Sequence, residues 1–384
     1  MRLSVAILTA EKREHDKDYA NPTPTFGTAP EALLQGFALL PEVDVHVLSC
    51  VREPVRAPEK LADNIWYHSL HVPKNGWLRT GYQGCIRATR KMLHEIRPDI
   101  VHGQGTEHNN ALCAVFSGFP NVLTIHGNMA ALAALFRARF GGYYWLTARL
   151  EDFALGRTDG VFCNSAYTES QVRSRARKTW RVPNPLRREF FAPVPDGARP
   201  AVLLNVGVIT GRKRQLELLD VAQNLHRLGL KFEFQFIGHV NPSEPYGAAF
   251  LERIKPLEAA GCARHLGEFA TAELIRRFDA AGGLIHFPSE EAFGLVAAEG
   301  MARGLKFFGA RVGGVTDIAG DVSGAELFDP EDWSGLTGAI AGWIRQGHPS
   351  LPEAAVQMRE KYHPLSIARR HLEIYREVLG KKEG

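Results

Sequence analysis

The chain has 384 residues, more than one hydrophobic core usually serves, so two domains are expected. Hydrophobic residues make up 45% and charged residues 23%, as in soluble globular proteins, and no apolar run approaches the roughly 18 residues that a membrane span needs. The net charge is +4, and residues 1–190 hold 24 Lys and Arg against 18 Asp and Glu. This mildly basic half suits an anionic substrate or a membrane surface better than nucleic acid.

The N-terminal apolar segment, residues 3–10, is too short for a secretory signal, and charged residues follow it at once. It is predicted to be a buried strand of a protein that stays in the cytoplasm. The five cysteines are scattered and never form a Cys-x-x-Cys pair, so reduced thiols are expected rather than disulfides or a metal site.

Short apolar runs then alternate with longer segments of helical periodicity. In the first half, strands are predicted at 3–10, 43–50, 98–105, 121–127 and 160–165, with helices at 29–40 and 87–96. In the second half, strands are predicted at 201–209, 232–240 and 283–289, with helices at 215–229, at 271–281 and from about 293. This alternation predicts an α/β fold built from parallel βαβ units with helices on both faces of each sheet.

The break between the halves is predicted within residues 190–200, which are rich in Pro and Gly. Residues 1–190 and 201–362 are therefore expected to form two Rossmann-like, doubly wound domains joined by a linker at 191–200. Residues 364–380 form a long amphipathic helix pattern. Two such domains would face a central cleft, and in open parallel sheets ligands bind beyond the carboxyl ends of the strands.

The segment HFPSEEAFGLVAAEGMARG, residues 286–304, carries the strongest functional pattern. Glu291 follows a predicted strand, and Glu299 lies on the helix after it. The start of that helix supplies unpaired amides and a favourable dipole for an anion, and a glycine there lets a ligand approach the backbone. These amides belong to Phe293, Gly294, Leu295 and Val296. Each glutamate alone is better explained as a helix cap or a solvated residue, whereas the combined pattern favours a ligand with phosphates and sugar hydroxyls.

Four features of this region occur in a fixed order: a strand ending in Pro-Ser, a Glu-x7-Glu spacing around Phe-Gly, a helix of small residues and a Gly-Gly turn at 313–314. In this combination the chain resembles the retaining nucleotide-sugar glycosyltransferases of family four, which have the GT-B fold. The likeness spans almost the whole chain. It includes LLNVGVITGRKRQLELLDVA, PDIVHGQG, VLTIHGNM, CNSAYTESQV and VPNPLRREFFAP in the family's order. It implies that residues 363–384 cross back to the first domain.

The resemblance implies roles for residues of the second half. Glu291 would contact the hydroxyls of the donor sugar, and Glu299 would contact the ribose. Lys213, which follows the strand that carries Gly207, would neutralise the charge of the diphosphate. Val208 stands where the family usually has an arginine, and Arg212 is hypothesised to supply that charge instead.

In the first half, Gly27 and Thr28 occupy the position of the family's glycine-rich loop, of which one glycine remains. His126 matches a histidine near the transferred sugar, although a lone histidine at a strand end is as well explained structurally. His102 and Asn184 also match landmarks of the family and are interpreted as structural.

The resemblance implies transfer of a hexose-type sugar from a UDP- or GDP-sugar, with retention, to a sugar, a lipid-linked acceptor or a small molecule. The leaving phosphate would act as base, so neither a protein nucleophile nor a metal or other cofactor is expected. Two alternatives remain. One is a nucleotide-sugar epimerase or hydrolase on the same fold. The other is a non-catalytic nucleotide-sugar-binding protein, which is favoured by Val208 and the single Gly27.

Three segments mix basic and aromatic residues, as interfacial helices do. For residues 77–91 and 136–150, an aromatic face packed into the core with arginines in water is favoured over peripheral contact with the inner face of the membrane. Residues 173–181 are interpreted as a solvated face, with a phosphate-rich acceptor as the alternative. No nucleic-acid motif accompanies the positive charge.

Overall fold

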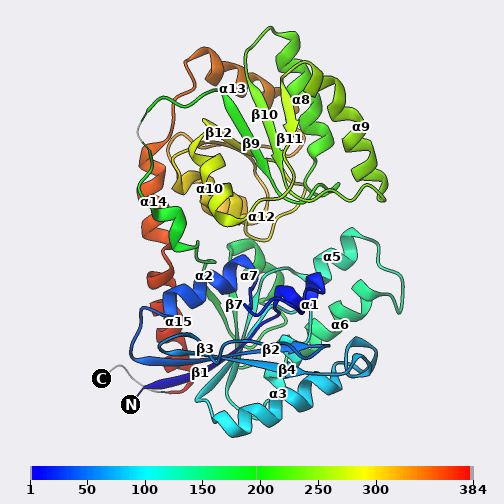
Figure 1. Cartoon of the computed structure of the whole chain (residues 1–384), viewed down its shortest axis with the longest axis vertical. Coiled ribbons are helices and arrows are strands. Elements are labelled where there is room, and N and C mark those ends of the chain that lie inside the picture. The colour runs from blue at the N-terminus through cyan, green and yellow to red at the C-terminus, as the bar shows by residue number, and fades with distance from the viewer. Residues whose placement is uncertain (1, 196, 381–384) are drawn as a thin grey trace. The chain divides into compact units, whose positions relative to one another are not determined.

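The computed structural model describes residues 2–195 and 197–380 and divides the chain into two compact units (Figure 1). The first unit comprises Met1–Arg187 and Tyr362–Gly384, and the second comprises Arg188–Lys361. Each contains one largely parallel sheet covered by helices, which confirms the predicted α/β class.

The first unit is built on an eight-stranded sheet of order β3-β4-β2-β1-β5-β6-β7-β8. All neighbours pair in parallel except β3 with β4. The strands are β1 (Leu3–Leu8), β2 (Val43–Val51), β3 (Lys60–Ala62), β4 (Ile65–His71), β5 (Ile100–Gln104), β6 (Asn121–Ile125), β7 (Gly160–Cys163) and β8 (Thr179–Arg181). Because chain order reverses between β1 and β5, their carboxyl ends form the switch point at which such sheets bind ligands.

Helices cover both faces of this sheet. The side chains of β1 alternate, so that Val5 and Ile7 enter one apolar cluster while Ala6 and Leu8 enter the other. The first cluster is closed by α2 and α15, and the second by α3, α4 and α6. The helices are α1 (Lys12–Asp16), α2 (Thr28–Phe37), α3 (Gln83–Ile96), α4 (Asn110–Val115), α5 (Met129–Leu135), α6 (Tyr143–Leu155), α7 (Ala166–Val172) and α15 (Pro364–Val378), with short 3-10 turns at Lys74–Gly76 and Leu78–Thr80.

The second unit has a six-stranded parallel sheet of order β11-β10-β9-β12-β13-β14. The strands are β9 (Val202–Val206), β10 (Glu233–Ile237), β11 (Ala263–His265), β12 (Gly283–His286), β13 (Lys306–Ala310) and β14 (Glu326–Phe328). The order reverses between β9 and β12, which places the switch point of this sheet there.

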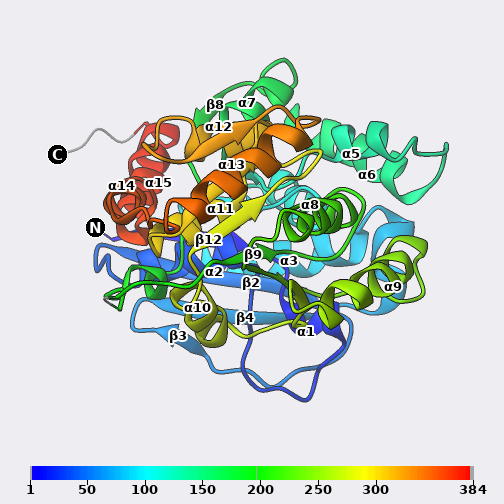
Figure 2. The ribbon, with the colours of Figure 1, turned by 90° about the horizontal axis from the view of Figure 1, so that it is seen from above.

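The helices of the second unit lie on both sheet faces (Figures 1 and 2). Residues of α8, α9 and α13 share a core with Ile285, whereas α11 packs on the neighbouring Leu284, whose side chain points to the other face. The helices are α8 (Gln215–Arg227), α9 (Pro245–Ala259), α10 (Thr271–Asp279), α11 (Leu295–Ala302), α12 (Gly313–Ala319), α13 (Trp333–Arg345) and α14 (Pro352–Tyr362), and a 3-10 turn spans Arg188–Phe191.

The segment predicted as a linker, residues 191–200, differs from that expectation, because it belongs to the second unit from its start. Arg303 is 1% exposed, and its guanidinium donates to the backbone oxygens of Phe190, Ala192 and Pro193. Asp279 accepts from the same guanidinium at 2.8 Å. A buried arginine whose donors are all used fixes this stretch against the unit.

The C-terminal helix α15 belongs to the first unit, as the family resemblance implied. It packs on α2 so closely that a Cβ atom at Gly36 would lie 2.2 Å from the oxygen of Pro364. Tyr375 on α15 also reaches the buried His102 of β5, with the two polar atoms 2.5 Å apart. The helix is therefore an integral part of the first unit's core.

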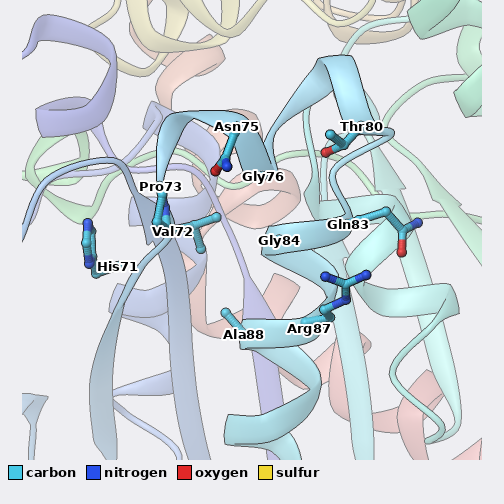
Figure 3. Close-up of a pocket in the computed structure, with 10 residues that line it drawn as sticks. All are labelled: His71, Val72, Pro73, Asn75, Gly76, Thr80, Gln83, Gly84, Arg87 and Ala88. Carbon is cyan, nitrogen blue, oxygen red and sulfur yellow. The ribbon is translucent and has the colours of Figure 1, made fainter.

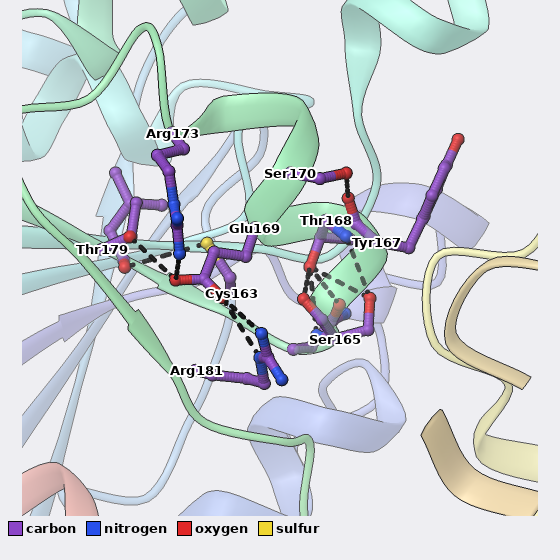
Figure 4. A network of polar contacts seen from close by, with 11 residues as sticks. Cys163, Ser165, Tyr167, Thr168, Glu169, Ser170, Arg173, Thr179 and Arg181 are labelled. Atoms are coloured by element: carbon purple, nitrogen blue, oxygen red, sulfur yellow. Dashed lines mark hydrogen bonds and ion pairs between the residues drawn. The ribbon is translucent and has the colours of Figure 1, made fainter. Parts of the chain in front are cut away.

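The basic segment 173–181 is largely occupied by contacts within the first unit (Figure 4). Ser165 caps α7 with a reciprocal bond to Thr168, and Glu169 on the same helix accepts from Arg181, at 2.8 Å, and from Arg173. Burial is outweighed by these arginine contacts, so the pKa of Glu169 lies below its usual range. The arginines thus hold α7 and β8 together, which favours the structural interpretation over a phosphate site.

The two aromatic segments of the first unit behave differently. Trp77 and Tyr82 are buried, as expected. The interpretation of residues 136–150 as core-packed was wrong for its tip, because Phe136 is 50% and Phe140 86% exposed. Within the part of the chain that the structure describes, no helix is both long and apolar enough to cross a membrane.

Candidate functional site

An ion pair lies at the carboxyl end of the second sheet, where β9 and β12 diverge. Lys213, in the turn before α8, places its Nζ 2.5 Å from Oε2 of Glu291, which follows β12. His286, the last residue of β12, places its Nε2 3.2 Å from the same oxygen. The structure therefore brings together two of the residues singled out from the sequence, and adds a histidine that sequence reasoning missed.

Burial and charge oppose each other at this pair. Burial alone would raise the pKa of Glu291, but Lys213 and His286 outweigh it and hold that pKa well below its usual range. Burial lowers the pKa of Lys213, and Glu291 counters part of that effect. Burial and then the positive charge of Lys213 lower the pKa of His286 to about 4. His286 is thus neutral at pH 7 and donates its Nε2 proton to the carboxylate.

Arg212 lies beside this pair, as the hypothesis about the missing arginine requires. Its Nη1 is 3.8 Å from Oε2 of Glu291 and donates to the backbone oxygen of Glu290 at 2.9 Å. Val208, where the family usually has the arginine, is 51% exposed at the end of β9. The preceding Gly207 has φ 150°, a conformation that favours glycine. The same Nη1 of Arg212 is 3.6 Å from Oε2 of Glu290, so two cations and two carboxylates gather here, and both cations contact Glu291.

The loop after Glu291 leads into α11, which begins at Leu295 rather than at the predicted Phe293. Gly294 adopts φ 96° as the residue before the helix, so its conformation demands glycine. Phe293 is buried ahead of the helix, and its amide is not one of the helix-end amides that were expected. The first amides of α11 belong to Leu295 and Val296.

A close approach of α12 fixes this loop. The amide of Gly314 donates to the backbone oxygen of Glu291 at 3.0 Å. A Cβ atom at position 314 would lie 2.5 Å from Cα of Phe293 and 2.6 Å from the oxygen of Ala292. The glycine of the predicted Gly-Gly turn is thus needed because two backbones touch.

Glu299 lies on α11 and is 5% exposed. It is just over one turn into the helix, not the two turns that the sequence suggested, because the helix begins two residues later. A buried carboxylate is unlike the solvated helix residue of the simpler explanation. Its assignment to the ribose stays a prediction.

In the first unit, His126 follows β6, and its Nε2 lies 3.0 Å from Oε1 of Gln104 at the end of β5. Burial lowers its pKa to about 4, so the ring is neutral at pH 7. His126 and Asn184 line one small cavity, next to the start of α2. His102 is fully buried, with Nε2 2.7 Å from the hydroxyl of Thr124, which agrees with a structural role.

Gly27 and Thr28 mark the beginning of α2, where Gly27 precedes the first helical residue. Gly27 has φ −61°, and a Cβ atom there would meet only Pro30, at 3.7 Å. Neither its conformation nor the surrounding space within the first unit requires glycine. A ligand at these amides therefore remains a prediction for both residues.

A second carboxyl group that sequence reasoning missed lies beside the loop of His126. Glu107 accepts from the amide of Gly127 at 3.1 Å. Burial, with a contribution from the charge of Glu151, raises the pKa of Glu107 to about 7. No motif surrounds Glu107 in the sequence, and only the meeting of the loops after β5 and β6 reveals it.

Lowering the pH is expected to destabilise the protein already between about pH 6.5 and 4, where histidines rather than most carboxylates take up protons. The pKa values of His126, His286 and His371 fall to about 4, chiefly through burial, whereas an unfolded histidine titrates near 6.5. Unfolding therefore takes up protons between these values, so stability should fall as the pH drops from about 6.5 to 4. Thermal unfolding midpoints at pH 7.5 and 5 would measure this fall. It should be smaller in His286→Gln, and an equal fall would contradict the role of His286.

Among residues 2–195 and 197–380, no group of three or more His, Cys, Asp or Glu side chains is arranged to hold a metal ion. The expectation that the reaction needs no metal is not tested by this finding and stays a prediction.

Comparisons with known proteins agree with this geometry. The family model "Glycosyltransferase Family 4" matches residues 38–190, and "Glycosyl transferases group 1" matches residues 187–362. No curated protein matches the chain. Sucrose-phosphate synthase from Thermosynechococcus elongatus is 18% identical with a TM-score of 0.77, covering 99% of this chain and 100% of its own. HepE from Anabaena, in complex with UDP and glucose, is 14% identical with a TM-score of 0.73, covering 97% of this chain and 99% of its own.

A third solved structure, the lipopolysaccharide outer core galactosyltransferase WaaB, is 16% identical with a TM-score of 0.68 and covers 98% of this chain and 100% of its own. Identities this low show a shared fold, and the two family models, taken together, cover most of the chain. The chain belongs to the family-four glycosyltransferases with the GT-B fold.

Proposed function

We propose that the protein transfers a hexose from a nucleoside-diphosphate sugar, with retention of configuration, to a carbohydrate or lipid-linked acceptor. The observation that carries this proposal is the partly buried group of Lys213, Glu291 and Arg212 at the switch point of the second sheet. UDP is the first nucleotide to test, ahead of GDP, because HepE was solved in complex with UDP and glucose.

The chemistry follows from the charges that develop during transfer. The bond between the anomeric carbon and the diphosphate oxygen breaks, and the diphosphate takes the electron pair. The acceptor hydroxyl attacks from the same face, and its proton passes to the departing phosphate. Lys213, Arg212 and the first amides of α11 would stabilise the growing negative charge, since preorganised electrostatics are commonly the largest catalytic contribution. Glu291 would accept hydrogen bonds from the donor sugar. No step requires a metal.

The first experiment is a thermal-shift panel with UDP, GDP, ADP and their common sugars, on wild type and Glu299→Ala. A ligand at about a hundred times its Kd should stabilise the fold by roughly 2.7 kcal/mol. We expect the melting temperature of wild type to rise with the nucleotides of one base, and to rise less in Glu299→Ala. Glu353→Ala, at an exposed position of α14, is the matched control and should leave the shift unchanged. No shift with any nucleotide would contradict the proposal and favour the non-catalytic alternative.

Product analysis separates the remaining enzyme alternative. An epimerase or hydrolase would consume the donor without an acceptor, whereas a transferase should consume it only slowly until an acceptor is added. Donor turnover that is equally fast with and without acceptors would overturn transfer as the main activity.

We also propose that the tip between α5 and α6 contacts an anionic membrane surface. Phe140, Phe136 and Leu135 expose 86%, 50% and 48% of their surface. Three exposed arginines, Arg137, Arg139 and Arg149, accompany them. Apolar rings flanked by arginines are suited to the boundary between lipid headgroups and acyl chains, and a lipid-linked acceptor would be found there.

Sedimentation with lipid vesicles tests this contact. The protein should bind vesicles that contain phosphatidylglycerol, bind pure phosphatidylcholine less, and release as salt is raised. Phe140→Ser should weaken binding roughly tenfold, as expected for an apolar side chain no longer buried. Leu228→Ser is the control, because Leu228 is 54% exposed in the second unit. Equal binding of both variants would contradict the proposal.

A further inference from the structure

A pocket of about 250 Å³ opens at the carboxyl edge of the first sheet. Its lining residues follow four adjacent strands: Glu11 comes after β1, Arg52 after β2, Trp77 after β4 and His108 after β5. This edge is where ligands bind in open parallel sheets. The pocket is separate from the small cavity of His126, with which it shares no lining residue.

Arg52 is held in a fixed orientation inside this pocket. Its guanidinium lies 4.4 Å from the centre of the Trp77 ring, and its Nη1 donates to Oε1 of Glu14 at 2.6 Å. Its backbone amide donates to the other oxygen of Glu14 at 2.8 Å. Its Nε is buried and has no hydrogen-bond partner among the described residues. The guanidinium is stacked and braced, and its side chain is 34% exposed, so its other Nη donors are available to a planar anion.

The carboxylates nearby do not cancel this charge. Glu11 is paired with the buried Arg13 at 2.7 Å, and Glu14 accepts from Lys17 at 2.8 Å as well as from Arg52. Arg13 lies behind the pocket wall, and counted with it the three cations exceed the two carboxylates by one charge.

Two histidines supply further polar side chains to the pocket. His15 and His108 line it together with Arg52, and both histidines are exposed at its mouth. The pocket walls partly desolvate the His108 ring, and this effect, followed by the charges of His15 and Arg52, lowers the pKa of His108. His108 is therefore neutral at pH 7 and would meet an anion as an N–H donor.

We infer that this pocket binds a negatively charged group of the acceptor, a phosphate or a carboxylate, with Arg52 as its principal contact. The inference rests on the proposed transfer reaction, because it names the acceptor class of the same enzyme. It separates acceptors by charge: a neutral sugar would leave the Arg52 guanidinium with Glu14 as its carboxylate partner, whereas an anionic sugar would give it a second anion.

Titration calorimetry tests the inference without depending on turnover. Glucose 6-phosphate, glucuronate and glucose are titrated into wild type, Arg52→Gln, Arg52→Lys and Arg87→Gln. Arg87 is the matched control, because it is an exposed arginine that lines a neighbouring pocket on α3 (Figure 3). At least one anionic sugar should bind wild type ten or more times tighter than glucose does, and the better anion distinguishes phosphate from carboxylate.

Arg52→Gln should raise the Kd of that anion at least tenfold and leave glucose unaffected. Arg52→Lys should recover part of the affinity, and Arg87→Gln should match wild type. Circular dichroism would show whether Arg52→Gln is still folded. If it is not, Arg52→Lys provides the test instead. Equal binding of charged and neutral sugars, or an Arg52→Lys variant identical to wild type, would overturn the inference.

A second variant separates this pocket from the donor site. Lys213→Ala should leave the binding of glucose 6-phosphate unchanged, and loss of binding there would assign the anion to the donor site and overturn the inference. If no nucleotide shifts the melting temperature while glucose 6-phosphate still binds through Arg52, the proposed transfer fails and the anion pocket stands. If the nucleotide binds and glucose 6-phosphate does not, the proposed transfer stands and the anion pocket is refuted.

Discussion

Replacing Lys213 with alanine is expected to reduce sugar transfer by on the order of a hundredfold or more, as loss of one preorganised partner of a developing oxyanion commonly does. The Nζ of Lys213 lies 2.5 Å from Glu291, and its side chain is only 16% exposed. A cation in such a position is little screened by water, so it would act strongly on a diphosphate bound beside it. The turnover number with saturating donor measures the effect.

The same substitution leaves Glu291 without its closest cation. Arg212, at 3.8 Å, and the neutral His286, at 3.2 Å, would remain. The pKa of Glu291 should therefore rise from its lowered value, and removal of one partner of a buried pair costs stability. Thermal unfolding should show this loss in Lys213→Ala and a smaller loss in Lys213→Arg.

Lys231→Ala is the matched control, because Lys231 is exposed and lies in the turn before β10. It should retain the turnover of wild type. Arg212→Ala should have a smaller effect than Lys213→Ala, and the double variant should lose donor affinity as well. If the double variant binds donor like wild type, neither residue contacts the diphosphate, and the hypothesis that Arg212 replaces the missing arginine fails.

The strands and the donor-side motif could be predicted because their signals are local. Residues 283–289 read as a strand followed by a Pro-Ser loop, and the structure places β12 at Gly283–His286 with Glu291 beyond it. The spacing from Glu291 to Glu299 likewise placed the second glutamate on the following helix. Short-range patterns of this kind report the element and the loop after it.

The parts that could not be predicted depend on contacts between distant segments. His286 and Lys213 meet at Glu291 only because β9 and β12 are neighbours in the sheet, and Arg303 reaches Phe190 across more than a hundred residues of chain. No sequence motif marks Arg52, whose position over the ring of Trp77 depends on the end of β2 lying beside the turn that holds Trp77. The exposure of Phe140 was also misjudged. Its ring centre lies 4.5 Å from that of Trp145 and the residue is still 86% exposed, and composition does not say how much of an aromatic ring its neighbours cover.

Replacing Gly314 with alanine is expected to destabilise the second unit by about 1–3 kcal/mol, the usual cost of overpacking. The new Cβ would lie 2.5 Å from Cα of Phe293 and 2.6 Å from the oxygen of Ala292, and neither backbone atom can rotate away as a side chain would. α12 would have to move from the loop, which would strain the hydrogen bond from Gly314 to the backbone of Glu291. Donor affinity should therefore fall together with stability.

Gly338→Ala on α13 provides a control of opposite sign. No atom lies within 4 Å of a Cβ at that position, so the alanine should stabilise the helix by roughly 0.5–1 kcal/mol. Urea unfolding of both variants measures the two free energies, and titration with the donor nucleotide measures affinity. A Gly314→Ala protein as stable as wild type would show that the loop tolerates displacement. Unchanged donor affinity in a destabilised Gly314→Ala would show instead that the donor does not depend on where this loop holds Glu291.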